Sequence, residues 1–255
     1  AGLMDSITAR HTRSRGCAGL VMAREEYQDA FESYLKARKR ARTDHLWLAV
    51  LCGYSRNLMG KLHDEMAMIA SRVRNFLWQV PRGYYKTTLL SEIDTIQDTL
   101  NDPECRTLII HSDASKARGI LQKIRADLES ENLQFLFPDI VPTDQERRRD
   151  FTWNDDSIEV KRKKHYAEGS VDAKGWEQDL AGLHYDKVKC EDIVTKETSK
   201  PPQGRQKVKD FHSLISPILN KPIGIVWWIG NRWFLYDLYG EMMDGKVLNP
   251  DGFKY

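Results

Sequence analysis

The sequence has few cysteines and no long apolar run. No run of about 18 or more apolar residues is present, so we expect no membrane span. The start, Ala1 to Met4, lacks the apolar segment of a signal peptide. Widely spaced cysteines without a Cys-x-x-Cys pair indicate neither a zinc site nor a disulfide framework, and they fit a reducing, cytoplasmic setting. The chain has four of them: Cys17, Cys52, Cys105 and Cys190.

The chain also has little excess of positive over negative charge. The formal net charge is only +2, so the chain lacks a global basic field for nucleic acid. Local basic runs occur at 36–42, 147–149 and 161–164, and their ordinary interpretation is a solvated face. With 255 residues, 41% of them hydrophobic, the chain suits one large α/β domain or one domain plus a helical extension.

The periodicity of the apolar residues divides the chain near residue 75. Residues 1–74 read as a helical N-terminal extension, with helices over 25–42, 45–52 and 62–73 and with Asp44 as the N-cap of the second. Residues 75–255 alternate short apolar runs with helical patterns. Strands are predicted at 76–80, 107–111, 157–161, 188–190 and 223–229, and helices at 87–100, 115–128, 207–219 (interrupted at Pro217) and 237–243.

This alternation predicts an α/β fold with a mostly parallel sheet covered by helices on both faces. The first strand leads through a short loop into Lys-Thr-Thr, which opens a helix. A helix N-terminus presents unpaired N–H groups and a positive dipole end to an anion, and a lysine and a hydroxyl there suit nucleotide phosphates and Mg²⁺. We therefore expect a P-loop NTPase-type core that binds ATP through Arg82, Gly83, Tyr84, Tyr85, Lys86, Thr87 and Thr88.

This loop departs from the strict phosphate-loop pattern. That pattern places glycines at 80 and 85, where this chain has Val80 and Tyr85. Only Gly83 is available for an unusual backbone angle or a close phosphate approach. The competing interpretation is an ordinary strand-to-helix turn with an exposed Lys86.

Two later segments supply further candidates. Glu191 and Asp192 follow the 188–190 strand, where one carboxylate can hold Mg²⁺ and the other can position the attacking water. Asn231 follows Gly230 at the end of the 223–229 strand, at the sheet edge where ligands bind in open α/β folds. Adjacent carboxylates are also common on surfaces, and Gly-Asn is also turn chemistry.

Taken in order, these motifs resemble the ATPase domain of a viral large terminase, the motor that packages DNA into the capsids of tailed bacteriophages. The resemblance lies in the Pro-Arg-Gly start and Lys-Thr end of the phosphate loop, then Glu191-Asp192, then Gly230-Asn231 and Asp237-Leu238-Tyr239-Gly240, and it covers roughly residues 62–243. It implies that Lys86 is the phosphate-binding lysine and that Thr87 and Glu191 are associated with Mg²⁺. It further implies roles for Asp192 as catalytic acid, Arg82 as a charge near the γ-phosphate, Asn231 in coupling and Gln79 in adenine recognition.

The resemblance also implies partners: double-stranded DNA, a portal protein, the terminase small subunit and, in a pentameric ring on the procapsid, further copies of the chain. It places such a protein in the host cell cytoplasm. Arg147 to Arg149 and Arg162 are candidates for a trans-acting arginine finger or for DNA contact. Members of that family carry a nuclease domain after the ATPase domain, and because the sequence ends at Tyr255 we expect an isolated ATPase domain.

Two other classes of function stay open at this point. One is another P-loop DNA translocase or helicase-like ATPase. The other is a DNA-binding or capsid-docking module in which the Tyr85 departure marks a loop without catalysis. The order Glu-Asp, where Asp-Glu or Asp-Asp is commoner in the family, also leaves open which carboxylate is the catalytic acid.

Overall fold

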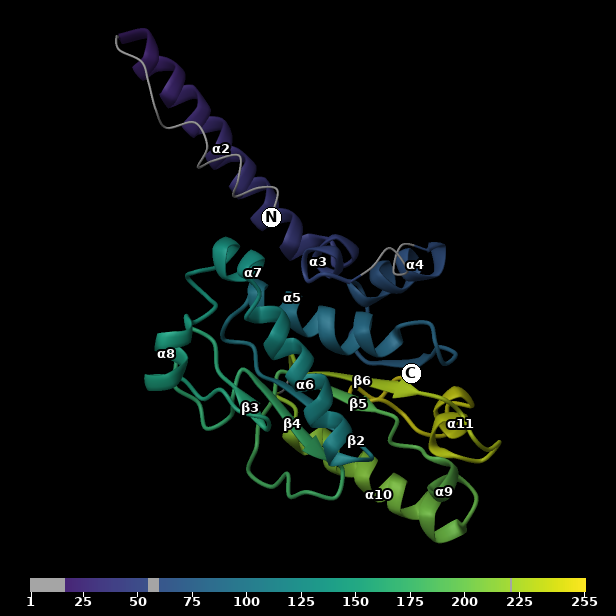
Figure 1. The fold of residues 1–255 in the computed structure, drawn as a ribbon. Coiled ribbons are helices and arrows are strands. Elements are labelled where there is room, and N and C mark those ends of the chain that lie inside the picture. The colour runs from purple at the N-terminus through teal and green to yellow at the C-terminus, as the bar shows by residue number, and fades with distance from the viewer. Residues whose placement is uncertain (1–16, 55–59, 221) are drawn as a thin grey trace. The chain divides into compact units, whose positions relative to one another are not determined.

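The computed structural model describes residues 17–54, 60–220 and 222–255 (Figure 1). The chain divides between Lys39 and Arg40 into two units. Helix α2 (Cys17–Thr43) runs through that division, and everything described below belongs to the second unit, residues 40–255. Within the described residues, no helix combines the length and apolar character that a membrane span requires.

The second unit contains one six-stranded sheet with the order β1-β6-β5-β2-β4-β3. All neighbouring strands run parallel except β3, which pairs antiparallel with β4 at one edge. The prediction of a mostly parallel sheet is therefore confirmed. The strands are β1 (Phe76–Gln79), β2 (Thr107–His111), β3 (Ser157–Ile158), β4 (Val171–Gly175), β5 (Lys187–Glu191) and β6 (Ile225–Gly230).

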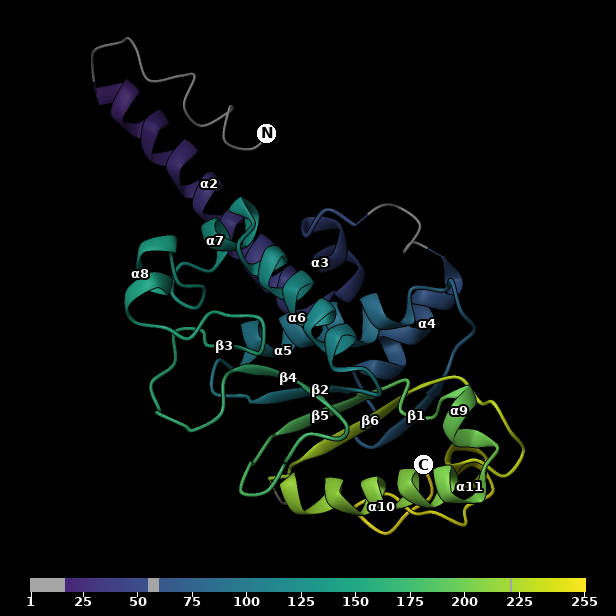
Figure 2. The same cartoon turned by 60° about the horizontal axis from the view of Figure 1, so that its bottom comes forward.

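Helices cover both faces of this sheet, as predicted (Figure 2). One face carries α3 (His45–Leu51), α4 (Lys61–Ala70), the π-helix η2 (Thr88–Ile93), α5 (Asp94–Asn101), α6 (Ala114–Leu128) and α7 (Glu131–Leu136). The opposite face carries α9 (Lys196–Ser199), α10 (Pro202–Ile218) and α11 (Leu238–Met243), while α8 (Asp144–Arg149) lies beside the β3 edge.

Helices α3 and α4 belong to the compact unit. Both pack against η2, and the unit begins at Arg40 rather than at the composition change near residue 75. Asp44 caps α3 as expected, since its carboxylate accepts a hydrogen bond from the Trp47 N–H at 2.8 Å. The two helices therefore form part of the layer that covers the sheet.

The apolar core on the α10 and α11 side follows from strand alternation. Side chains two residues apart on a strand share a face, and the buried strands of a parallel sheet contribute to both faces. Helix α10 buries Val208, Phe211 and Ile215 against this face. The strand residues in the same cluster are Leu108, Ile110, Val188, Cys190, Val226 and Trp228.

The opposite face of β5 holds a buried ionic cluster instead of apolar side chains. Lys187 and Lys189 both donate to the Asp94 carboxylate, at 2.6 Å and 2.8 Å, and Lys187 also donates to Asp98 at 2.7 Å. His45 contacts the second Asp94 oxygen at 2.9 Å. The sequence places Val188 and Cys190 inward, but both lysines of β5 are buried too, because α5 brings carboxylates to meet them.

One strand was not predicted, and two predicted helices differ from the structure in form. Strand β4, with the sequence Val-Asp-Ala-Lys-Gly, has too little apolar character to be recognised from the sequence. Pro217 does not interrupt α10, which continues through it to Ile218. The predicted 87–100 helix exists, but it begins as η2 before continuing as α5.

Candidate functional site

Three strand ends bring the sequence motifs together. Strand β6 lies between β1 and β5, and all three run parallel. Their carboxyl ends therefore meet at one edge of the sheet. The loop after β1, the Glu191-Asp192 pair at the end of β5 and Asn231 after β6 all lie at this edge.

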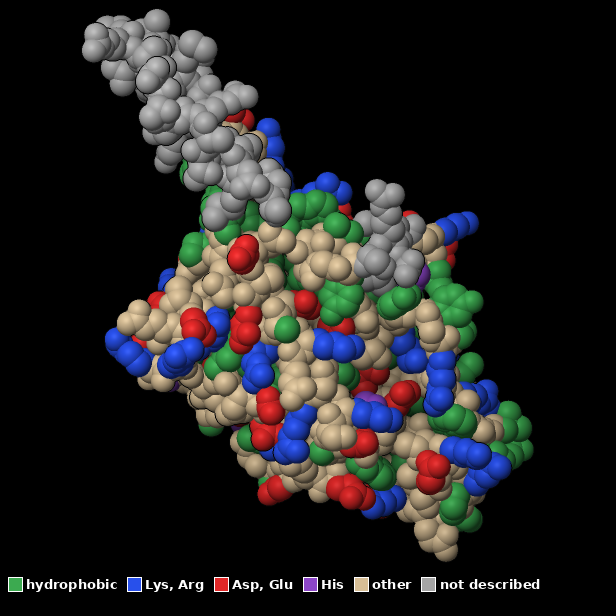
Figure 3. All heavy atoms as spheres, viewed as in Figure 1, with side chains coloured by type: hydrophobic (Ala, Val, Ile, Leu, Met, Phe, Trp, Pro, Cys, Tyr) green, Lys and Arg blue, Asp and Glu red, His purple; other side chains and the backbone are tan. Residues whose placement is uncertain are grey.

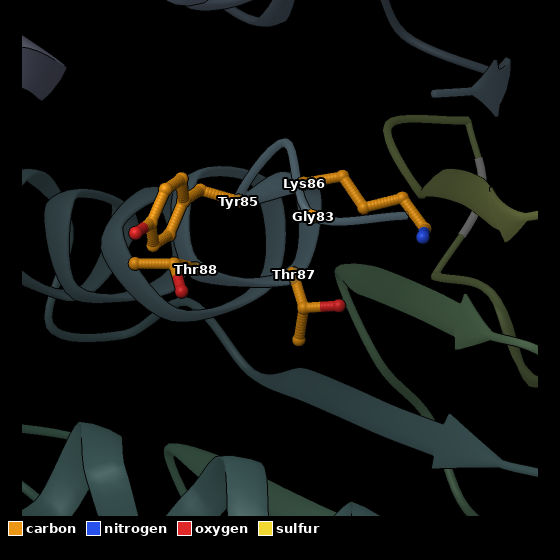
Figure 4. Close-up of a pocket in the computed structure, with 5 residues that line it drawn as sticks. All are labelled: Gly83, Tyr85, Lys86, Thr87 and Thr88. Atoms are coloured by element: carbon orange, nitrogen blue, oxygen red, sulfur yellow. The ribbon is translucent and has the colours of Figure 1, made fainter. Parts of the chain in front are cut away.

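The loop between β1 and η2 encloses an open pocket of about 360 Å³, lined by Gly83, Tyr85, Lys86, Thr87 and Thr88 (Figure 4). Gly83 has a φ of 85° and Tyr85 a φ of 52°. Both residues are therefore in the left-handed region, which costs a residue with a side chain about 1–2 kcal/mol. Tyr85 stands where the strict pattern has glycine, and it holds the backbone angle that glycine adopts without strain.

Lys86 is buried, in contrast to the exposed lysine of an ordinary turn. It lies at the start of the continuous helix formed by η2 and α5. The six residues of η2 are all buried, and a π-helix is often found at functional sites. The lysine ammonium and the free N–H groups of this helix start can therefore act together on an anion.

Glu191 is the most enclosed carboxylate of the site. Thr87 donates its hydroxyl to one Glu191 oxygen at 3.3 Å, and the Ser91 hydroxyl donates to the other. Burial raises the pKa of Glu191 to about 7, assisted by the charge of Asp192, while the Ser91 and Thr87 hydroxyls and the Lys86 charge oppose the shift. Ser91 is not among the site residues predicted from the sequence, although it lies one helical turn after Thr87.

Asp192 and Asn231 each carry a buried polar atom that has no hydrogen-bond partner in the described part of the chain. The Asp192 N–H donates to the Ile229 carbonyl at 2.8 Å, and the backbone at Asp192 has a φ of 42°. Within the described residues, Asp192 Oδ1 and Asn231 Nδ2 are buried and make no hydrogen bond. Buried polar groups are normally satisfied, so this pair of atoms is suited to a bound polar ligand or water.

Arg82 and Gln79 connect the phosphate loop to the segment after β6. The Arg82 guanidinium lies over the Trp233 ring, 5.0 Å from its centroid. Gln79 Oε1 accepts a hydrogen bond from the Arg232 N–H at 3.0 Å. Both predicted site residues thus contact the segment that directly follows Asn231, and they link the phosphate loop to it.

His111 is a site residue that no sequence motif marks. It ends β2, and its Cα pairs with that of Glu191 on the neighbouring strand. Its Nδ1 accepts a hydrogen bond from the Asp113 N–H at 2.9 Å, so the neutral ring carries its proton on Nε2. Burial lowers the pKa of His111, and the charge of Asp192 acts in the opposite direction. The ring is therefore held neutral beside the acidic pair.

The arginines suggested for DNA or trans contact fall into two groups. The side chains of Arg147 and Arg162 are only 8% and 3% exposed and are held by Asp144 and Glu159. Those of Arg148 and Arg149 are 78% and 69% exposed. Basic and acidic side chains intersperse on the face drawn in Figure 3. Of the four, Arg148 and Arg149 are the ones accessible to a partner.

Gly230 packs directly against the buried Tyr239. A Cβ at residue 230 would lie 2.8 Å from the Tyr239 ring. We expect Gly230→Ala to lower the free energy of unfolding by about 1–3 kcal/mol, because a fully buried ring cannot move aside. Urea denaturation measures this. The matched control is Gly119→Ala in α6, where an added Cβ meets nothing within 4 Å. This change is expected to stabilise the helix by up to about 1 kcal/mol. Equal effects of the two changes on the free energy of unfolding would contradict the packing argument.

The donor set fits a magnesium ion that is shared with phosphates. Among the residues that the structure describes, no three His, Cys, Asp or Glu side chains gather into a metal-binding group. Mg²⁺ at nucleotide sites is usually bound by one or two protein oxygens together with phosphate oxygens and water. Thr87 and Glu191, 3.3 Å apart, provide such oxygens beside the Lys86 pocket.

No protein-family model matches the chain, and no curated protein sequence matches it.

Proposed function

We propose that the chain is a P-loop-type ATPase domain. The observation that carries the proposal lies at one edge of the sheet, where the parallel strands β1 and β5 end on either side of β6. A buried lysine, a carboxylate bonded to hydroxyls and a carboxylate with one oxygen that has no partner among the described residues meet there. These are Lys86, Glu191 and Asp192. Phosphoryl transfer needs little more than positioning and charge stabilisation, which these groups supply.

Each residue has a role that its surroundings support. Lys86 and the N–H groups at the start of η2 bind the β- and γ-phosphates. Thr87 and Glu191 are the residues that would hold Mg²⁺, which neutralises phosphate charge when bound. Asp192, whose Oδ1 has no partner among the residues that the structure describes, orients the attacking water, and the Nδ2 of Asn231 donates to the γ-phosphate or to that water. Arg82 contributes positive charge near the phosphates.

The resemblance to large terminases extends the proposal from ATP hydrolysis to DNA packaging. In this scheme the domain drives double-stranded DNA into a procapsid, working in a ring at the portal with the small subunit. The contacts of Arg82 with Trp233 and of Gln79 with Arg232 support it, because they give the phosphate loop a mechanical link to the segment after β6. DNA contact of this kind is made to phosphates and is salt-sensitive.

Lys86→Ala tests the nucleotide site. We expect it to weaken binding of ATP with Mg²⁺ by at least about tenfold, since a hydrogen bond to a charged group is worth about 1.5–3 kcal/mol. Isothermal titration calorimetry with a non-hydrolysable analogue measures the affinity, and Lys116→Ala on the surface of α6 serves as the control.

The outcomes separate the three functions. Unchanged affinity in the Lys86→Ala variant refutes the site assignment. Absence of ATP binding to the unaltered chain supports a DNA-binding or capsid-docking module without catalysis. ATP-dependent separation of a forked duplex favours a helicase-like motor over a packaging motor.

A further inference from the structure

The phosphate pocket has two distinct sides. Figure 4 shows the Tyr85 ring beside Thr88 on one side of the loop, while Lys86 extends on the other. The acidic pair belongs to the second side, because Glu191 accepts a hydrogen bond from the Thr87 hydroxyl. A triphosphate with its terminal phosphate near these groups directs its nucleoside toward Tyr85 and Thr88.

Tyr85 offers a flat aromatic surface at that end of the pocket. The residue lines the pocket and remains 42% exposed. It keeps this position although its backbone is in the left-handed region, where an ordinary residue is strained. A base stacks on an aromatic ring whatever its identity, because every base has a π-face.

His63, near the start of α4, lies directly against Tyr85. The two rings meet edge to face with centroids 6.2 Å apart. His63 is only 7% exposed, and in the described part of the chain neither of its ring nitrogens has a hydrogen-bond partner. Leaving buried polar atoms unpaired is unfavourable, so their presence indicates a ligand that provides a donor and an acceptor.

We propose that Tyr85 and His63 form the base-binding part of the nucleotide site. Tyr85 stacks on the base, and the His63 imidazole, with one donor and one acceptor nitrogen, hydrogen-bonds to the base edge. Adenine presents an amino donor and ring-nitrogen acceptors, which match that pair. The inference rests on the proposed function, and it assigns base recognition to residues other than Gln79, whose carbonyl oxygen is already bonded to Arg232.

Calorimetry with two ligands, ATP and inorganic tripolyphosphate, each with Mg²⁺, tests the role of Tyr85. Tyr85→Asn removes the ring but tolerates the left-handed backbone, and it is expected to weaken ATP binding about 5- to 150-fold. Tripolyphosphate, which has no base, is expected to bind this variant as it binds the unaltered chain. The conservative variant Tyr85→Phe keeps the ring and is expected to restore most of the ATP affinity that Tyr85→Asn loses.

His63→Phe tests the hydrogen bonds while keeping an aromatic ring against Tyr85. The unaltered chain is expected to prefer ATP to purine riboside triphosphate, which lacks the amino group, and the variant is expected to bind both equally. If Tyr85→Asn weakens ATP and tripolyphosphate equally, the ring serves only the loop, and the inference is overturned. If the unaltered chain binds neither ligand, the proposed nucleotide function itself fails.

Discussion

Asp94→Asn is expected to lower the free energy of unfolding by about 3–5 kcal/mol, the usual effect of leaving a buried charge without its partner. Asp94 is the common acceptor for Lys187, Lys189 and His45. Burial alone would raise the pKa of Asp94, but the two lysine charges hold it well below its usual range. The carboxylate is therefore ionised in the fold, and the amide of asparagine cannot replace it.

Chemical denaturation of matched variants measures this effect. Asp98→Asn is the control, because the Asp98 side chain is 29% exposed and Lys187 still has Asp94 when Asp98 is neutral. Lys189→Met in the Asp94→Asn background is expected to recover part of the loss, since an apolar side chain of similar length replaces an ammonium that has lost its counter-charge. Equal losses in the two single variants would contradict the central role given to Asp94.

The parts of the fold that sequence reasoning finds are those with a strong apolar pattern. The run at 107–111 is buried along its length and the run at 225–230 is buried except for the partly buried Ile225. The first is a strand where the pattern indicates it, and the second lies within two residues of the predicted bounds 223–229. Strand β4 has alternating polar residues and a short length, so its pairing with β2 depends on neighbours that the sequence does not reveal. Lys187 and Lys189 make β5 look like a weak, partly exposed strand in the sequence. Both lysines are buried, because they bind carboxylates about ninety residues away in the chain.

The candidate site likewise contains residues that the sequence predicts and residues that it does not. Lys86, Thr87, Glu191, Asp192 and Asn231 are found because each follows a strand or opens a helix, and parallel strands bring such positions to one edge. Ser91, His63 and His111 are not found, because their places depend on the helix face, on packing against Tyr85 and on the register between β2 and β5. The sheet order that puts β6 between β1 and β5 is likewise a tertiary property.

Asp192→Asn is expected to reduce the rate constant of ATP hydrolysis about 10²- to 10⁴-fold while leaving ATP affinity within a few-fold. The structure distinguishes the two carboxylates by their partners. Glu191 accepts hydrogen bonds from Thr87 and Ser91 and is enclosed next to Lys86, whereas Asp192 Oδ1 has no partner among the described residues. A carboxylate that orients water needs a free oxygen, which favours Asp192 as the catalytic carboxylate that acts as the base.

Glu191→Gln is the matched change on the neighbouring residue. If Glu191 serves the metal, the variant is expected to need a higher Mg²⁺ concentration for nucleotide binding, a shift that Asp192→Asn does not produce. Single-turnover phosphate release gives the hydrolysis rate, and calorimetry at several Mg²⁺ concentrations gives the metal dependence. If Glu191→Gln loses hydrolysis at unchanged Mg²⁺ dependence while Asp192→Asn shifts that dependence, the two roles are exchanged, and the hydrogen bonds from Thr87 and Ser91 then hold the catalytic base itself.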